Sequence, residues 1–292
     1  MKRMKMKLGI AIVLGILLVG GKVALAQAPA SQQPSTPAQT DKDKPIAPIT
    51  TQPLTLDATP PPVSAEEDAA MKTFRDTPIT DLAKKNQLGE DFVQKYPQSR
   101  YRVEVYSWLV KGYLGVNDID KMEAAGDKEL AIEPADATTL ALLGQTLPRA
   151  MSGSMSAADR EKRLDKAEQY SKKTLDLLPA LAKPVNLTDD QFTAAKNLTS
   201  AMAYSGLGLV AFRRGKFADA IPNLDQAVKI DPNPDPVNYY ILGICNEKSS
   251  HFDDAIAAFT KCAGMPGGMQ DRCKSGAEEA KKLSTTQLSV PK

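Results

Sequence analysis

Histidine is almost absent from this chain, and this absence limits the chemistry available to it. The 292 residues contain one histidine, His251, which falls in a turn just before Phe252. Histidine-rich zinc sites need a second histidine, and a lone turn histidine is a poor base for a nucleophilic triad. We therefore predict no metal site and no catalytic residues of these kinds.

Signals for strands and for phosphate-binding loops are also missing. No β-branched run alternates with period two, and no Asn-Gly or Asp-Gly turn joins two apolar segments. Gly206 and Gly208 lie inside a helical pattern rather than after a strand, so they do not form a nucleotide loop. The acidic pairs at 189–190 and 253–254 open helices, where negative charge suits the helix dipole. The sequence predicts an all-α protein that is not an enzyme and binds no cofactor.

A long apolar run occurs only at the N-terminus. Four basic residues within the first seven positions precede an uncharged, mostly apolar run over 8–21, followed by Lys22 and then Ala24-Leu25-Ala26. This order is typical of a secretory signal peptide, and the run is shorter than the roughly 20 residues that span a bilayer. We predict a signal peptide over 1–26, cleaved near Ala26, and a periplasmic or secreted protein. An uncleaved inner-membrane anchor is the alternative.

Excess positive charge is confined to the same segment. Removing the five basic residues of 1–26, which contains no acidic residue, changes the net charge from +2 to −3. A weakly acidic protein lacks the basic surface that supplies nonspecific affinity for nucleic acid. We therefore predict a protein or peptide partner, with no nucleic acid and no small-molecule substrate.

The segment 27–62 has few large apolar residues and is dominated by Pro, Ala, Gln, Ser and Thr. Such a composition buries too little surface to offset its ordering entropy. We predict a disordered Pro-rich linker here, a helical domain over 63–284 and a disordered tail over 285–292. Ser64 with Glu67 and Thr188 with Gln191 form capping-box patterns, so helices should begin just after Ser64 and Thr188. A weaker start follows Ser156.

Small and large residues recur at a fixed spacing in the C-terminal half. The first copy is Tyr204, Leu207, Gly208 and Ala211, then Gly215, then Phe217, Ala220, Leu224 and Ala227, ending before Pro232. The second copy is Tyr239, Leu242, Gly243, Phe252, Ala255, Phe259 and Cys262, and Gly243 follows Gly208 by 35 residues. Spacings of three and four place these residues on one helical stripe, with the small residues allowing two antiparallel helices to approach closely. Pro222 is expected in the first turn of its helix, where the missing amide hydrogen is tolerated.

These residues resemble the tetratricopeptide repeat family, most clearly over 201–234 and 236–268. Fainter copies span 106–134, with Glu129 where a small residue is expected, and 140–179, with a polar insertion at 151–156. The resemblance implies a helical-hairpin solenoid wound as a right-handed superhelix, whose concave face holds peptides or partner proteins. The amphipathic segment after Met269 is expected to cap its C-terminal end.

In that family the first helix of each pair lines the concave face, which places a candidate groove on this chain. Its residues are Met202, Ser205, Leu209, Phe212, Arg213, Tyr240, Ile244 and Lys248. An apolar helix or extended segment would suit this wall, with Phe212 and Tyr240 as anchors and Arg213 or Lys248 setting its orientation. Family members that clamp terminal carboxylates use Lys and Asn here, so we predict no such clamp. The alternative is that these side chains belong to the core.

The three cysteines, Cys245, Cys262 and Cys273, all lie near the C-terminus. Cys262 occupies a small-residue packing position, which is compatible with an inert buried thiol. In an oxidising compartment, adjacent helices of a solenoid would also allow a Cys262–Cys273 disulfide, with Cys245–Cys273 as the next choice.

The sequence thus favours an exported, non-enzymatic adaptor of the bacterial cell envelope. A self-associating structural protein of the periplasm is one alternative. Another is an outer-membrane assembly factor, because Phe92, Tyr96-Pro97, Ser99 and Tyr101 resemble a pattern in envelope tetratricopeptide proteins. A helix that ends at Pro97, followed by a cap at Ser99, explains the same residues.

Overall fold

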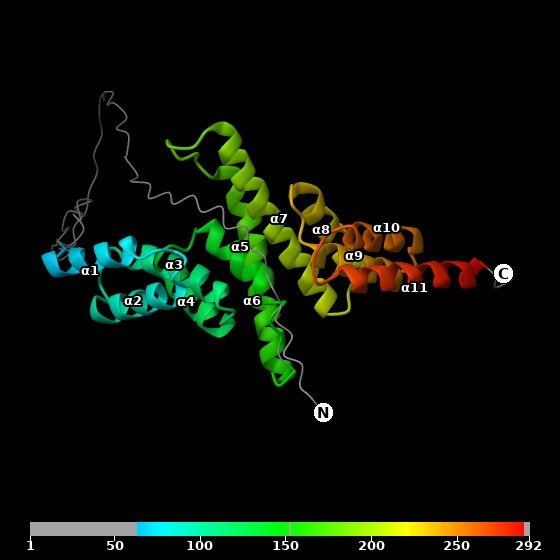
Figure 1. Ribbon diagram of the computed structural model, residues 1–292, viewed down its shortest axis with the longest axis horizontal. Coiled ribbons are helices and arrows are strands. Elements are labelled where there is room, and N and C mark those ends of the chain that lie inside the picture. The colour runs from blue at the N-terminus through cyan, green and yellow to red at the C-terminus, as the bar shows by residue number, and fades with distance from the viewer. Residues whose placement is uncertain (1–62, 152, 289–292) are drawn as a thin grey trace, which may run out of the picture. The chain divides into compact units, whose positions relative to one another are not determined.

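The computed structural model describes residues 63–151 and 153–288, and all regular structure in these ranges is helical (Figure 1). The elements are α1 (Ala65–Asp76), α2 (Leu82–Lys95), α3 (Arg102–Gly115), α4 (Ile119–Ile132), α5 (Ala137–Thr146), α6 (Ala157–Leu177), the 3-10 turn η1 (Leu178–Ala180), α7 (Asp189–Arg213), α8 (Phe217–Ile230), α9 (Pro236–Lys248), α10 (Phe252–Ala263) and α11 (Gln270–Leu288). The predicted all-α fold is confirmed for these residues. The predicted signal peptide and linker lie outside them.

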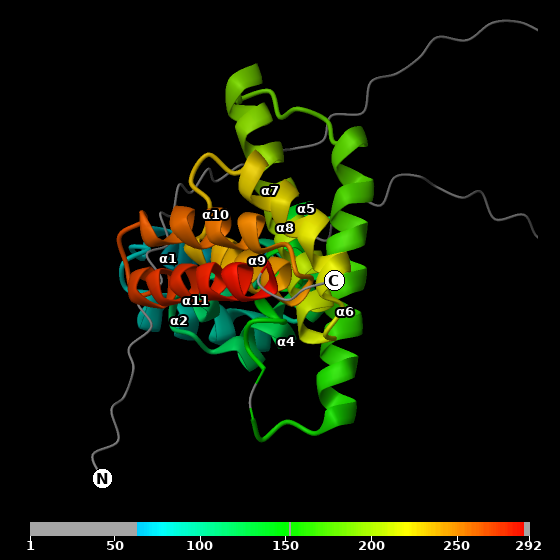
Figure 2. The ribbon, with the colours of Figure 1, turned by 90° about the vertical axis from the view of Figure 1, so that its right-hand side faces the viewer.

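The helices form consecutive hairpins that stack on one another. The pairs α3 with α4, α5 with α6, α7 with α8 and α9 with α10 each pack closely, and the second helix of each pair also contacts the first helix of the next. α11 packs on α10 and α9, as expected of a cap. The long helices α6 and α7 extend past their shorter neighbours (Figure 2).

Glycines at the hairpin contacts allow this close stacking. A Cβ atom added at Gly208 would lie 2.6 Å from Leu224, and one added at Gly243 would lie 2.6 Å from Phe259. Both distances are too short for real atoms, so the helices could not approach as they do with larger side chains. The repeat pattern in the sequence therefore marks packing positions.

The predicted helix starts are confirmed by their caps. Thr188 and Gln191 form a reciprocal capping box, with hydrogen bonds of 3.0 and 3.2 Å. The hydroxyls of Ser64 and Ser156 each accept a hydrogen bond of 3.1 Å from a backbone amide in the first turn. No described helix has both the length and the apolar character needed to cross a bilayer.

Two details differ from the sequence predictions. Because α8 already begins at Phe217, Pro222 lies in its second turn rather than its first, on the exposed side of the helix. α11 continues past Ser284 to Leu288, so part of the predicted C-terminal tail is helical. The hydroxyls of Thr285 and Thr286 donate to the carbonyl of Lys282, at 2.8 and 2.9 Å, and so remain within the helical hydrogen-bonding pattern.

Candidate functional site

Arg149, in the segment after α5, joins the first helices of three hairpins. Its Nη1 atom pairs with the Asp235 carboxylate just before α9, and its Nη2 atom lies 3.2 Å from both Ser205 Oγ of α7 and Asn238 Oδ1 of α9. Ser205 in turn donates to Asn238 Oδ1 at 2.7 Å. The contacts of Arg149 with Asp235 and Asn238 span more than 80 residues of sequence, and the network ties the end of α5 to α7 and α9.

The structure corrects the position of two predicted groove residues. The exposed fraction of Ser205 is 0% and that of Leu209 is 3%, so both side chains are covered by neighbouring helices. Ser205 is engaged by Arg149 and Asn238. For these two residues the alternative interpretation, that they belong to the core, is the correct one.

The two predicted aromatic anchors pack in different parts of the core. Phe212 is half-buried, lies 6.1 Å from Phe217 between ring centres and packs on a cluster shared by α8 and α9. The Tyr240 ring packs at a tilt against that of Phe259, with ring centres 5.8 Å apart, and with Ile244 it packs on a separate cluster shared by α10 and α11. The structure therefore does not bring Phe212 and Tyr240 together as one wall.

The remaining groove residues are accessible to different degrees. Met202 is half-buried, whereas Arg213 and Lys248 are exposed. Lys248 lies 3.8 Å from the carboxylate of Glu247, a distance that gives a weak, solvent-screened contact. Of the predicted set, Arg213 and Lys248 are the exposed residues and can reach a partner most directly.

Arg213 differs from its neighbour Arg214 in how its charge is balanced. Arg214 binds three carboxylates of α6, with Nε donating to Glu161 at 2.7 Å, Nη2 to Asp165 at 2.6 Å and Nη1 to Glu168. Arg213 donates instead to two backbone carbonyls, Pro148 O at 2.8 Å and Arg149 O at 3.5 Å.

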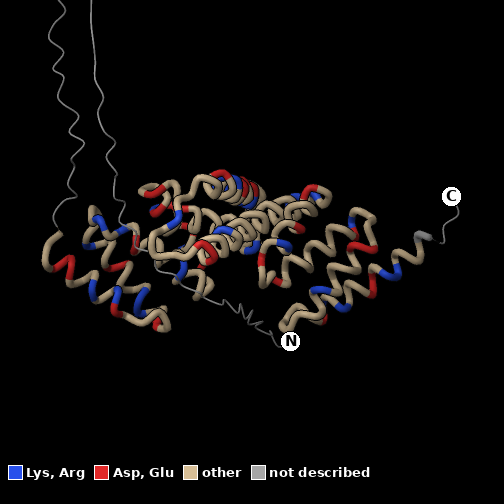
Figure 3. The backbone as a smooth tube through the Cα atoms, turned by 90° about the horizontal axis from the view of Figure 1, so that it is seen from above, with Lys and Arg blue, Asp and Glu red and all other residues tan. Residues whose placement is uncertain are grey.

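No acidic group in the described part of the chain pairs with Arg213. Partial burial and the nearby positive charge of Arg160 lower its pKa. Two cations therefore lie near each other, Arg160 in the first turn of α6 and Arg213 at the last residue of α7. Elsewhere, basic and acidic residues are interspersed along the helices (Figure 3).

An apolar patch, missed in the sequence, lies where α6 connects to α7. Val185 is fully exposed, and Leu181 and Leu198 are 42% and 48% exposed. Leu181 also lines a cleft of 150 Å³, whose other lining residues are Ala137, Thr138, Leu178, Ala182, Pro184, Leu187, Phe192, Ala195, Lys196 and Thr199. The signal was the short apolar sequence at 181–187, which carries no helical periodicity. Ligand pockets for drug-sized molecules start at about 300 Å³, so this cleft suits one aliphatic side chain of a protein.

The cysteines occupy the C-terminal hairpin and its cap. Cys262 and Cys273 form a disulfide between α10 and α11, with Cα atoms 5.7 Å apart. Cys245 is free and buried, and burial raises the pKa of its thiol to about 12. A thiol with so high a pKa is protonated at neutral pH and is a poor nucleophile. In the described residues, no group of three or more His, Cys, Asp or Glu side chains is placed to hold a metal ion.

Comparisons with known proteins agree with this architecture. A family model described as "Tetratricopeptide repeat" matches residues 201–234, which cover the end of α7, α8 and the turn that follows. The chain therefore contains a tetratricopeptide repeat, and its stacked hairpins give it the all-α solenoid fold of that class. No curated protein matches it.

Three solved structures illustrate the similarity. A thermophilic TPR protein of Thermus thermophilus, TTC0263, is 17% identical over 73% of this chain and 98% of its own, with a TM-score of 0.44. PilW, a type IV pilus biogenesis factor, is 14% identical over 79% and 97%, with a TM-score of 0.46. Yeast Tom70 is 16% identical over 77% and 45%, with a TM-score of 0.45.

Proposed function

We propose that this protein is an exported, non-enzymatic scaffold of the bacterial cell envelope that binds a protein partner. The proposed binding face is formed by α5, α7 and α9, the first helices of their hairpins. The observation that carries this proposal is the exposed Arg213, which has no acidic partner among the described residues. An uncompensated cation fixed by two carbonyls is arranged to receive an acidic group from outside.

The proposed partner is a segment that combines an acidic group with apolar side chains. Met202 lies on the same stripe of α7 as Arg213, because the two positions are 11 residues, or about three turns, apart. Arg213 would bind the acidic group, and half-buried Met202 and Phe212 would contact the apolar part. Arg149 is occupied by Asp235, so its role is to hold the face together.

Capture of partners from intact cells tests this proposal. Crosslinking followed by mass spectrometry would identify the partner, and purified full-length variants would then be compared in pull-downs. We expect Arg213→Glu to reduce capture at least about tenfold, since one charged hydrogen bond is lost and a repulsion is added.

Lys229→Glu is the matched control, because Lys229 is exposed on α8, the second helix of the same hairpin. It makes the same change of charge away from the proposed face. Equal capture by wild type and Arg213→Glu, or equal loss in both variants, would contradict the assignment of this face.

The export proposal rests on the first 26 residues, and residues 27–62 would then tether the scaffold. Cell fractionation with N-terminal sequencing of the mature protein tests it. We expect a mature chain that begins near Gln27 and occurs outside the cytoplasm. A mature chain that still begins with Met1 would contradict the cleaved signal peptide and would favour the uncleaved membrane anchor.

Self-association is a second candidate function, favoured by the patch of Leu181, Val185 and Leu198. Val185 is fully exposed and its sequence neighbour Pro184 lines the apolar 150 Å³ cleft, so a second copy could supply the side chain that fills this cleft. Light scattering should then show a dimer that Val185→Asp dissociates, while the same change at exposed Val116 does not. A wild-type monomer at all concentrations would exclude this function.

A further inference from the structure

The junction between α4 and α5 is the narrowest link between successive hairpins. α4 packs less extensively against α5 than α2 packs against α3, α6 against α7 or α8 against α9. α4 is also absent from the helices that pack closely against α6. The helices α1–α4 are therefore attached to the following hairpins by a small backbone contact.

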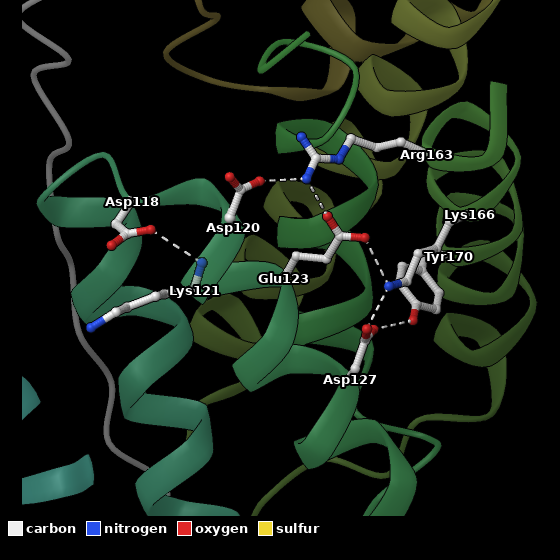
Figure 4. Close-up of polar contacts among 8 residues, drawn as sticks. All are labelled: Asp118, Asp120, Lys121, Glu123, Asp127, Arg163, Lys166 and Tyr170. Atoms are coloured by element: carbon white, nitrogen blue, oxygen red, sulfur yellow. Dashed lines mark hydrogen bonds and ion pairs between the residues drawn. The ribbon is translucent and has the colours of Figure 1, made fainter. Parts of the chain in front are cut away.

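Long charged side chains bridge the remaining space between α4 and α6 (Figure 4). Arg163 of α6 lies 2.6 Å from Asp120 and 2.7 Å from Glu123 of α4. One turn further, Lys166 lies 2.9 Å from Glu123 and 2.6 Å from Asp127. Tyr170 completes this ion ladder by donating to Asp127 at 2.9 Å.

Solvent reaches the outer carboxylates of this ion ladder, while its centre is largely buried. A cleft of 580 Å³ lies beside it and is lined by Glu123, Met155, Asp159, Lys162, Arg163, Asp165, Lys166 and Gln169. The side chain of Asp120 is 86% exposed and that of Asp127 is 44% exposed. Arg163 and Glu123 are only 13% and 18% exposed, so dissolved salt screens mainly the pairs that Asp120 and Asp127 make.

A buried carboxylate lies within the narrow junction itself. Glu129 of α4 is 0% exposed, and its Oε2 atom accepts a hydrogen bond of 2.8 Å from Thr139 of α5. Its Oε1 atom has no partner among the described residues.

The groups that face Glu129 offset the cost of burying its charge only in part. Ser107 and Lys111 of α3 and Thr139 of α5 lower its pKa, whereas Asp136 at the start of α5 raises it. Burial, with a contribution from Asp136, raises the pKa of Glu129 to about 7. An ionised Glu129 is a buried charge whose direct partners are the hydroxyls of Thr139 and Ser107 and not a cation, which weakens the contact that it occupies.

We propose that the α4–α5 junction is a hinge whose opening is controlled by salt, through the ion ladder, and by pH, through Glu129. High salt weakens the outer pairs of the ladder, and loss of the Glu129 proton loosens the junction. Opening would change the orientation of α3 relative to α5, and hence the curvature of the face formed by the first helices. This hinge does not depend on the identity of any partner.

Energy transfer between two dyes across the junction tests the hinge in the full-length protein. The dyes would be placed by Gln94→Cys on α2 and Gln226→Cys on α8, both exposed, in a Cys245→Ala background. We expect the transfer efficiency to change when NaCl is raised from 0.05 to about 1 M, a range that shortens the screening length from more than 10 Å to about 3 Å. We also expect it to change between pH 5.5 and 8.5 at constant ionic strength.

A second dye pair serves as a control, and two variants separate the salt response of the ion ladder from the pH response of Glu129. Gln226→Cys with Glu279→Cys places both dyes on the same side of the junction, so its signal should stay constant. Glu129→Gln should remove the pH response and keep the salt response, and Lys166→Gln should reduce the salt response at least twofold. A constant signal across the junction in the wild type, or an equal change in the control pair, would overturn the hinge. A full pH response in Glu129→Gln would overturn the role of Glu129.

Discussion

The α8–α9 junction and the α4–α5 junction join similar hairpins by different means. Between α8 and α9, Ala220 and Leu224 pack against Leu242 and Cys245 in a buried apolar cluster. Between α4 and α5, Gly126 packs near Leu143, but Glu129 lies buried in the same contact and an ion ladder spans the adjacent opening. One repeat architecture can thus combine rigid apolar contacts with contacts that respond to the solvent.

The largest expected effect is loss of the apolar contact in the C-terminal hairpins. Gly243→Leu would force a side chain into space held by Phe259, where even a Cβ atom would be 2.6 Å away. We expect the free energy of unfolding to fall by at least about 3 kcal/mol, the upper range for overpacked cores. Chemical denaturation measures this. Gly268→Leu is the control, since nothing lies within 4 Å of a Cβ at Gly268, and equal loss in both variants would refute the packing role.

The next largest effect is expected at Glu129, in the α4–α5 junction. Because the pKa of Glu129 is raised from 4.5 to about 7, the folded protein binds more protons than the unfolded chain between these values. The contribution of Glu129 to the free energy of unfolding therefore falls as pH rises through this window and is constant above it.

The difference in the free energy of unfolding between wild type and Glu129→Gln isolates this contribution. From pH 4 to pH 8 the wild type should lose up to about 3 kcal/mol of stability relative to the variant, at 1.36 kcal/mol per pKa unit. Parallel urea denaturation at each pH measures it. A difference that is independent of pH would show that Glu129 does not titrate in the folded protein.

The disulfide tests whether the cap needs a covalent link in addition to apolar packing. Cys262 and Cys273 are separated by 11 residues, a loop short enough that closing it stabilises the fold by about 2 to 3 kcal/mol in the chain-entropy model. The double variant Cys262→Ala with Cys273→Ala should lose this amount by thermal or chemical denaturation. Cys245→Ala serves as the control for removing a buried thiol without a bridge. No loss in the double variant would assign the cap's stability to packing alone.

The smallest effect is expected from the ion ladder. Lys166→Gln removes contacts with Glu123 and Asp127, which are partly exposed, so we expect a loss of about 1 kcal/mol at low salt. The loss should shrink in 1 M NaCl. Lys172→Gln, which removes only an exposed pair with Glu168 on the same helix, should change stability less. A loss in Lys166→Gln that is independent of salt would indicate that the side chain acts through packing.

The fold was predictable because its signals are local. Caps such as Thr188 with Gln191, and small residues such as Gly208 and Gly243, act between neighbouring turns or within one hairpin. Their spacing in the sequence reports their contacts directly. The degenerate repeat is also informative, since Glu129 stands at a packing position where the repeat pattern expects a small residue.

The candidate site was less predictable because it depends on distant residues. Ser205 and Leu209 have the spacing of an exposed groove, but packing between the hairpins covers them. Arg149, which follows α5 and binds Ser205 of α7, lies in an irregular segment and belongs to no motif. Whether Arg213 has a carboxylate partner likewise depends on the turn of α6 that packs beside it.

Hydrogen exchange followed by mass spectrometry at increasing NaCl tests the contrast between the two junctions most directly. The predicted result is that amides of α4 and the first turns of α6 exchange several-fold faster in 1 M than in 0.05 M NaCl, while those of α8 and α9 do not change. The same change in exchange rate in both regions would contradict the account.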